Sequence, residues 1–123
     1  HLKSDVKFDF MSVSSYSGVE SKTLVVRQDI KEDIRGKNVL IVEDILDTGK
    51  VLICDELENS LHESVISQVT LLDKEEGRVF DMKADYSGFK IPNAFVVGYG
   101  LDFNERYRQL PYIGILKEDC YKK

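Results

Sequence analysis

The sequence predicts an α/β fold built around a parallel sheet, and three observations lead to it. Residues 39–42 form a continuous β-branched and apolar run, which is typical of a central parallel strand buried on both faces. Apolar residues then recur at helical spacing among charged ones, which predicts an amphipathic helix over about residues 50–62. A second β-rich run spans residues 65–72. The order strand, helix, strand predicts a βαβ unit and therefore a parallel sheet.

The remaining elements are shorter. Residues 16–23 are small and polar, and they predict a mobile loop near residues 15–23. A charged stretch over residues 28–38 ends in a turn at 35–38. Further strands are expected at residues 8–15, 24–27, 86–91, 95–99 and 112–116.

Length and composition predict one domain over residues 1–123. Apolar residues make up 42% and charged residues 32% of the 123 residues, as in globular proteins. The formal net charge of -5 argues against general binding to nucleic acid or a membrane surface. No apolar run reaches the length of a membrane span. Cys54 and Cys120 fit no metal-binding spacing, which is typical of a reduced intracellular, cytoplasmic protein.

Acidic residues are concentrated directly after the predicted strand at 39–42. Glu43, Asp44 and Asp47 come first, and residues 48–50, Thr-Gly-Lys, begin the predicted helix. Ligands of parallel α/β sheets bind at the carboxyl ends of the strands, and a helix N-terminus can hold a phosphate. Beside an anion site, three carboxylates make sense if they bind ribose hydroxyls, hold a divalent cation or move a proton. The alternative is that they only cap the helix.

Two other phosphate-binding motifs are excluded by position. A Walker A loop would need glycine where Asp44 stands and Ser or Thr where Val51 stands. The dinucleotide fingerprint needs three glycines on the turn, and only Gly49 is present.

The segment from Val39 to Gly49, VLIVEDILDTG, resembles the phosphoribosyl-pyrophosphate (PRPP) signature of type I phosphoribosyltransferases. Four later segments resemble the hypoxanthine-guanine phosphoribosyltransferases, as does Ser14-Ser15-Tyr16, which is similar to the start of that family's mobile catalytic loop. The later segments are LLDK at 71–74, DYSGFKIP at 85–92, FVVGYGLD at 95–102 and ERYR at 105–108.

The resemblance, which runs from about residue 8 to residue 116, implies a Rossmann-like phosphoribosyltransferase core. It also implies an Mg²⁺-dependent purine-salvage enzyme. The expected reaction transfers 5-phosphoribosyl from PRPP to hypoxanthine, guanine or xanthine, and yields IMP or GMP plus pyrophosphate. A homodimer or homotetramer is expected.

The resemblance also assigns residues to the reacting centre. Glu43 and Asp44 match the acids that hold the ribose hydroxyls of PRPP and can also order Mg²⁺. Asp47 matches the position beside the purine N7, where a general base would act. Ser15 and Tyr16 match loop residues that close over the centre and exclude water.

The 5′-phosphate cradle is assigned in the same way. A hydroxyl residue is common in the family where Val51 stands, so weaker phosphate binding is expected. The matching residues are Ile45, Leu46, Asp47, Thr48, Gly49, Lys50 and Val51.

The second half of the chain supplies the base and pyrophosphate sites implied by the resemblance. Lys74 matches the lysine that reaches the purine 6-oxo group; the alternative is a solvated lysine at a strand end. Phe95 matches the aromatic ring that stacks on the purine, and Val96 a residue whose backbone reads the base edge. Asp102 matches a residue of the purine site that is also an Mg²⁺ ligand, and Arg108 a pyrophosphate contact.

Several alternatives stay open at this point. Glu105 and Arg106 are expected to be a surface helical pair. A non-catalytic PRPP- or nucleotide-binding regulator of the same fold remains the main competing function. A phosphorylation-dependent signalling domain is less favoured, because its phospho-acceptor aspartate is not evident. Members of the family begin well before the strand expected at 8–15, with a strand, a helix and a Leu-Lys-Gly-type loop, so a fragment with an exposed sheet edge is expected.

Overall fold

The computed structural model describes residues 2–17, 22–49 and 65–122. Seven strands and two short 3-10 helices are present in this part of the chain. The helix expected over residues 50–62 lies outside it. No helix in these three ranges has both the length and the apolar character that crossing a bilayer requires.

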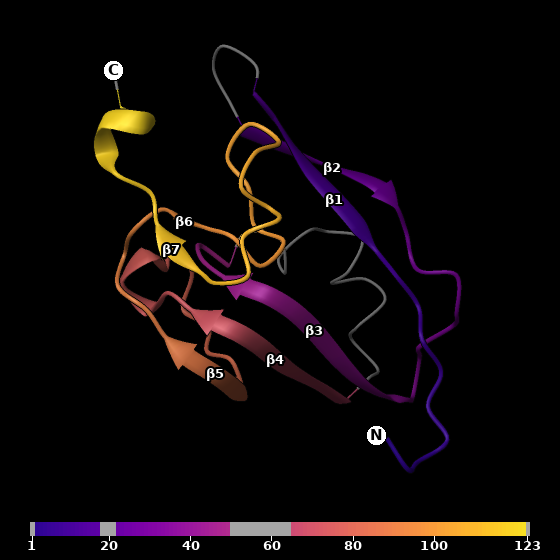
Figure 1. Ribbon diagram of the computed structural model, residues 1–123. Coiled ribbons are helices and arrows are strands. Elements are labelled where there is room, and N and C mark those ends of the chain that lie inside the picture. Colours follow the sequence, from indigo (N-terminus) through magenta and orange to yellow (C-terminus); the bar gives the residue numbers. More distant parts are fainter. Residues whose placement is uncertain (1, 18–21, 50–64, 123) are drawn as a thin grey trace.

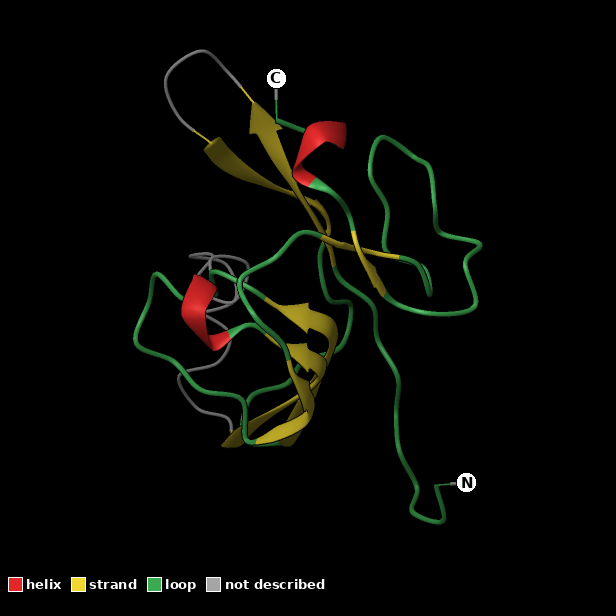
Figure 2. Cartoon of the chain, turned by 60° about the vertical axis from the view of Figure 1, so that its left-hand side comes forward, coloured by secondary structure: helices red, strands yellow, loops and turns green. Residues whose placement is uncertain are grey.

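The first two strands form an antiparallel hairpin, β1 (Ser12–Ser17) and β2 (Lys22–Gln28). Figure 2 shows this hairpin standing apart from the larger sheet. The expected strand at 8–15 and mobile loop at 15–23 are therefore wrong in their bounds, because residues 15–17 and 22–23 are paired strand residues. Antiparallel pairing satisfies the backbone groups of these small polar residues, so they need no apolar face of their own.

The segment before β1 is held in another way. The Asp9 carboxylate accepts backbone N–H bonds from Glu32 (2.9 Å), Lys31 (2.5 Å) and Phe10 (2.8 Å). These bonds lower the pKa of Asp9, the one from Glu32 most. Because Asp9 ties its segment to the chain after β2, residues 8–11 do not continue the strand.

A parallel three-stranded sheet forms the centre of the fold and confirms the predicted class. Its order is β3-β4-β5, made of β3 (Asn38–Leu46), β4 (Val65–Asp73) and β5 (Tyr86–Lys90). The three arrows lie side by side and point the same way (Figure 1). All three carboxyl ends therefore meet at one edge, where the sequence predicts the site.

β3 differs from the expected strand in two respects. It lies at the edge of the described sheet and pairs with β4, whereas a central strand was predicted. It also alternates between half-buried and exposed residues, with Leu40 56% and Val42 74% exposed. The prediction of burial on both faces is thus wrong for the described residues.

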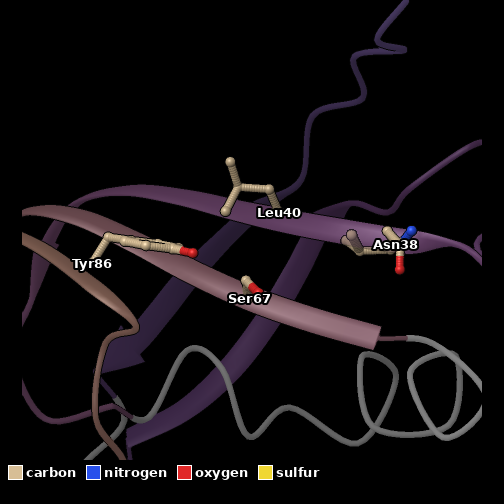
Figure 3. A pocket seen from close by; sticks show the side chains of 5 residues that line it. Asn38, Leu40, Ser67 and Tyr86 are labelled. Atoms are coloured by element: carbon tan, nitrogen blue, oxygen red, sulfur yellow. The ribbon is translucent and has the colours of Figure 1, made fainter. Parts of the chain in front are cut away.

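A shallow pocket lies on this sheet at the opposite end from the predicted site. It is formed near the first residues of β3, β4 and β5 (Figure 3), away from their carboxyl ends. The residues that line it are Asn38, Val39, Leu40, Ser67 and Tyr86.

The last two strands are shorter than predicted. β6 (Val96–Val97) and β7 (Gly114–Ile115) form a separate antiparallel pair. The 3-10 helix η2 (Glu75–Gly77) follows β4, and η3 (Glu118–Cys120) follows β7. Cys120 is exposed as a free thiol.

Burial is deepest where β3 and β4 end. Leu46 and Leu72 are 1% and 2% exposed, and Asp73 and Lys74 are buried beside them. The Lys74 N–H donates to the Leu46 carbonyl at 3.0 Å, so the two strand ends are joined by backbone as well. The best-packed part of the described sheet is therefore its carboxyl edge.

Candidate active site

The two acids assigned to ribose lie inside β3, because the strand continues to Leu46 instead of ending at Val42. Consecutive strand residues point to opposite faces, so Glu43 is half-buried and Asp44 is exposed. Asp44 Oδ1 accepts the N–H of Ile45 at 2.8 Å. Desolvation by burial raises the pKa of Glu43, the Asp44 charge adds to this, and Arg78 opposes it. The carboxyl end of β3 thus carries one solvated acid and one that holds its proton more tightly.

A tight turn follows β3 at residues 47–49. Gly49 has φ +80° and is buried, and a β-carbon there would collide with the Sδ atom of Met82. The left-handed backbone therefore favours glycine, and any other residue would also displace the Met82 side chain. The Thr48 carbonyl accepts the N–H of Val79 at 3.2 Å, which fixes the turn against the chain after β4.

The most direct contact between predicted site residues joins Asp47 and Lys74. Lys74 Nζ lies 2.9 Å from Asp47 Oδ2. The Lys74 side chain is 9% exposed and that of Asp47 is 44% exposed. The alternative of a solvated lysine at a strand end is therefore excluded. A partly exposed carboxylate and a buried ammonium group are thus joined by a hydrogen bond at the carboxyl ends of neighbouring parallel strands.

A second ion pair beside this site was not predicted. Asp73 Oδ1 accepts from Arg78 Nη2 at 2.5 Å, and Asp73 Oδ2 accepts from Ser87 Oγ at 2.8 Å. Both charged side chains are buried, at 4% and 11% exposure. The buried Nε and Nη1 atoms of Arg78 have no hydrogen-bond partner within the described residues. Asp73 was visible in the sequence as an acid directly after the apolar residues 71–72. No feature of the sequence indicates the role of Arg78.

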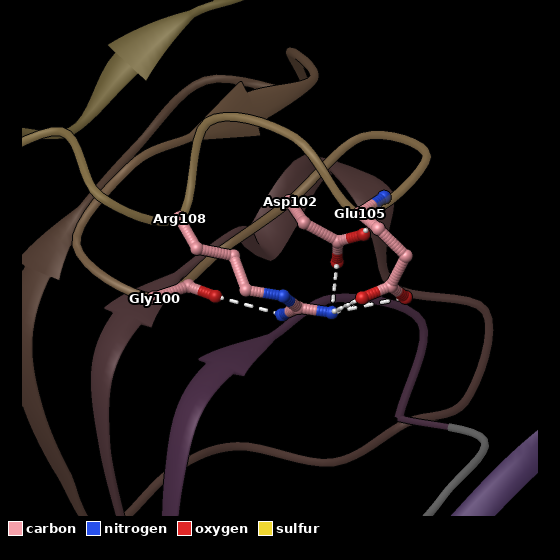
Figure 4. Close-up of polar contacts among 4 residues, drawn as sticks. All are labelled: Gly100, Asp102, Glu105 and Arg108. Carbon is pink, nitrogen blue, oxygen red and sulfur yellow. Dashed lines mark hydrogen bonds and ion pairs between the residues drawn. The ribbon is translucent and has the colours of Figure 1, made fainter.

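Asp102 and Arg108 also come together, on the loop between β6 and β7 (Figure 4). Arg108 Nη2 lies 3.2 Å from Asp102 Oδ1 and 3.2 Å from Glu105 Oε2, and Nη1 donates to the Gly100 carbonyl at 2.8 Å. The N–H of Glu105 donates to Asp102 Oδ2 at 2.9 Å. The loop between β6 and β7 therefore holds a carboxylate and a guanidinium group in direct contact.

The expected helical pair of Glu105 and Arg106 is wrong. Glu105 has φ +62° and pairs with Arg108, while Arg106 forms an isolated bridge with Phe103. A left-handed residue cannot continue a right-handed helix, so the spacing of charges misled the prediction.

Phe95 and Val96 lie where β6 begins. The centroid of the Phe95 ring lies 5.6 Å from that of Phe103, which it meets edge-on, and 5.1 Å from that of Tyr121. Phe95 is nevertheless 37% exposed. The Phe95 carbonyl accepts the N–H of Leu116 at 2.8 Å. The ring is thus held by two aromatic neighbours with part of its surface open.

The remaining predicted site residues are placed less completely. Ser15 and Tyr16 belong to β1, where they pair with Leu24 and Thr23. Lys50 and Val51, assigned to the phosphate cradle, lie outside the described residues.

Comparison with known proteins adds to this geometry. A family model for the phosphoribosyl transferase domain matches residues 1–104. The chain belongs to the phosphoribosyltransferase family. It is 51% identical to the hypoxanthine-guanine phosphoribosyltransferase of Streptococcus pneumoniae over 98% of this chain and 69% of that protein. It is 48% identical to the Bacillus subtilis protein of the same name, over 99% of this chain and 69% of the relative.

The fold of this phosphoribosyltransferase is shared with a solved relative. A crystal structure of a hypoxanthine phosphoribosyltransferase from Staphylococcus aureus superposes with TM-score 0.82 at 46% identity, over 98% of this chain and 67% of that one. The type I phosphoribosyltransferase fold implied by the sequence is confirmed. The residues matched by the family model include the acidic turn, whereas Arg108 lies just beyond them.

Proposed function

We propose that this phosphoribosyltransferase acts in purine salvage and transfers 5-phosphoribosyl from PRPP to hypoxanthine or guanine, with xanthine as a further candidate. The observation that carries the proposal is the 2.9 Å contact between Asp47 and Lys74 at the ends of β3 and β4. In this contact the partly exposed carboxylate of Asp47, a proton acceptor, lies beside the buried ammonium group of Lys74, a hydrogen-bond donor. A 6-oxopurine presents its oxygen and its N7 proton on the same edge, so a donor and a proton acceptor that lie side by side suit these two groups.

Recognition of the base follows from the described contacts. Lys74 donates to a 6-oxo acceptor but would face the amino group of adenine with another donor. Phe95 offers its open surface for stacking, and the short strand that Val96 begins fixes backbone groups near the base edge.

The ribose 5-phosphate part would lie along the acidic turn. Asp44 is exposed and would accept hydrogen bonds from ribose hydroxyls, whereas Glu43, which the family resemblance assigns to the same ribose, lies on the opposite face of β3. Backbone N–H groups of the turn at 47–49 would contribute to the phosphate cradle, to which the family resemblance also assigns residues 45–46 and the two residues outside the described part of the chain, Lys50 and Val51. The left-handed Gly49 gives the turn the curvature of an anion-binding nest.

The pyrophosphate would lie toward Asp102 and Arg108. Mg²⁺ fits here, because Asp102 supplies the hard oxygen ligand that this ion prefers. No group of three or more acidic, histidine or cysteine side chains forms a metal cage in residues 2–17, 22–49 and 65–122. Sparse protein ligation is usual for Mg²⁺, which keeps waters and substrate phosphate oxygens and would neutralise charge on the leaving group. Glu43 and Asp44 could hold it on the ribose side.

The chain's own residues then have distinct tasks in the reaction. The bond between C1′ and the pyrophosphate oxygen breaks, and both electrons leave with pyrophosphate toward Arg108. The purine nitrogen attacks C1′, and Asp47 accepts the proton at N7. The hairpin residues Ser15 and Tyr16 would close over the centre and exclude water. Replacing Asp47 by Asn should therefore lower turnover more than nucleotide affinity, and an equal loss of both would contradict a proton-transfer role.

We further infer that residues 1–123 act as one catalytic domain and assemble as a homodimer or homotetramer. The family resemblance motivates both statements, and sedimentation analysis of the chain would test the second.

Calorimetric titration with IMP, GMP, XMP, AMP and UMP in Mg²⁺ buffer tests the proposed function. Far-UV circular dichroism on the same sample checks the fold. We expect binding of 6-oxopurine nucleotides, much weaker binding of AMP and UMP, and a loss with Asp44→Asn. A folded chain that binds none of the five would contradict the proposal, including the version in which the domain is a regulator.

A further inference from the structure

Three successive residues after β4 lie near the acidic turn and the end of β4. Gly77 donates its N–H to the Lys74 carbonyl at 3.0 Å, and Val79 donates to Thr48 at 3.2 Å. Between them, Arg78 is anchored on Asp73.

Gly77 lies against the pair of Asp47 and Lys74. A β-carbon built on Gly77 would be 2.5 Å from Asp47 Oδ1 and 3.1 Å from Lys74 Cδ, with Asn93 Oδ1 at 3.3 Å. The φ of Gly77 is not in the left-handed region, so alanine could adopt this backbone. Glycine is needed here for space and not for conformation.

Movement of the Asp47 side chain would remove this overlap. Asp47 Oδ1 is the end of a side chain that is 44% exposed, so it can rotate toward solvent. Lys74 is 9% exposed and cannot move as freely. A methyl group on Gly77 would therefore displace the Asp47 carboxylate and leave the strands in place.

We infer that Gly77 is a positioning residue for phosphoribosyl transfer, because its missing side chain lets the Asp47 carboxylate lie beside Lys74 Nζ. The inference rests on the proposed function, in which Asp47 accepts the proton at N7 and Lys74 contacts the 6-oxo group. Displacing a reacting group by about 1 Å can lower turnover about 100-fold without preventing substrate binding.

The test compares Gly77→Ala with Gly114→Ala, each with Asp47 intact and with Asp47→Ala. Gly114, in β7, is the matched control, because its added β-carbon would make an ordinary contact of 3.5 Å with the ring of Tyr112. Four quantities are measured for each protein: turnover, affinity for IMP, the thermal midpoint, and the NMR signal of the Lys74 ζ-nitrogen.

We expect Gly77→Ala to shift the Lys74 signal and to lower turnover about 10- to 100-fold, with IMP affinity and thermal midpoint close to wild type. On the Asp47→Ala background, where the carboxylate is gone, it should cause no further loss. Gly114→Ala should change none of the four quantities.

Three results would overturn the inference. An unchanged Lys74 signal would mean that the pair does not move. A loss of turnover that is the same on both backgrounds, or that follows a lowered thermal midpoint, would mean that Gly77 acts on the fold and not through Asp47. A folded wild-type chain that binds neither IMP nor GMP would refute the proposed function, and the inference with it; the wild-type titration separates this case from the other two.

Discussion

The ion pair between Asp73 and Arg78 should be the most sensitive electrostatic contact in the described structure. Both side chains are almost fully buried, at 4% and 11% exposure, and their atoms approach to 2.5 Å. Replacing Arg78 by Met keeps the unbranched stem of the side chain but removes the guanidinium group, and it leaves Asp73 charged and buried. Ser87 still donates one hydrogen bond to that carboxylate but brings no positive charge.

The expected loss is large. Removing one member of a buried ion pair costs about 3–5 kcal/mol, because the remaining charge loses its compensation. With unfolding free energies of about 5–15 kcal/mol for single domains, Arg78→Met should fold but be marginal. The thermal midpoint should fall by about 12–20 °C, at roughly 4 °C per kcal/mol for a domain of this size.

Urea denaturation followed by circular dichroism measures the effect, with two comparison proteins. The double variant Asp73→Asn/Arg78→Met removes both charges and should recover most of the loss. Arg35→Met breaks an exposed ion pair with Asp33, in which the charged atoms lie 2.7 Å apart and the two side chains are 60–68% exposed. This variant should leave the urea midpoint nearly unchanged. If Arg78→Met were no more destabilising than Arg35→Met, burial would not govern the strength of these contacts and our reasoning would be wrong.

Two other predictions concern the site itself. Because the folded state raises the pKa of Glu43 above its usual 4.5, it binds that proton more tightly than the unfolded chain. In metal-free buffer, Glu43→Gln should therefore match wild type below pH 4.5 and become the more stable protein as pH rises, which urea midpoints at several pH values would show; a constant difference would contradict the assignment. Lys74→Met should reduce the preference for IMP over AMP by at least about 10-fold in calorimetric titrations, because a charged hydrogen bond contributes about 1.5–3 kcal/mol. Lys90→Met, which breaks an exposed pair with Glu75, should leave that preference intact, and a similar effect of both variants would argue against base reading by Lys74.

Residues that follow local patterns were predicted well. The apolar runs at 39–42 and 65–72 became β3 and β4, and their parallel pairing follows from the order of elements. The hairpin was mispredicted, because a polar strand owes its structure to the opposite strand and not to its own hydrophobicity. The neighbours of β3 decide whether it lies at the centre or the edge of a sheet, and its own sequence does not contain them.

The candidate site was likewise predicted only in part. Asp47 and Lys74 were assigned from motifs, and the structure brings them into contact, although their roles in the reaction stay predictions. Gly77 and Arg78 were missed because their importance lies in contacts with residues up to 30 positions away, such as Gly77 with Asp47. Glu105 was assigned to a helix from charge spacing alone, and its left-handed backbone could not be read from that spacing.

The separation of the hairpin from the parallel sheet has a consequence for how the chain folds. Closing β1 on β2 joins Ser17 to Lys22, five positions apart, whereas β3 and β4 first meet at Asn38 and Val65, 27 positions apart. The longer closure costs about 1.5 kcal/mol more in chain entropy, so the hairpin should form early and the sheet late. The edge that carries Asp47 and Lys74 is then assembled in the last steps. A nucleotide bound there would slow unfolding of the sheet, and hydrogen exchange of the sheet amides would measure this.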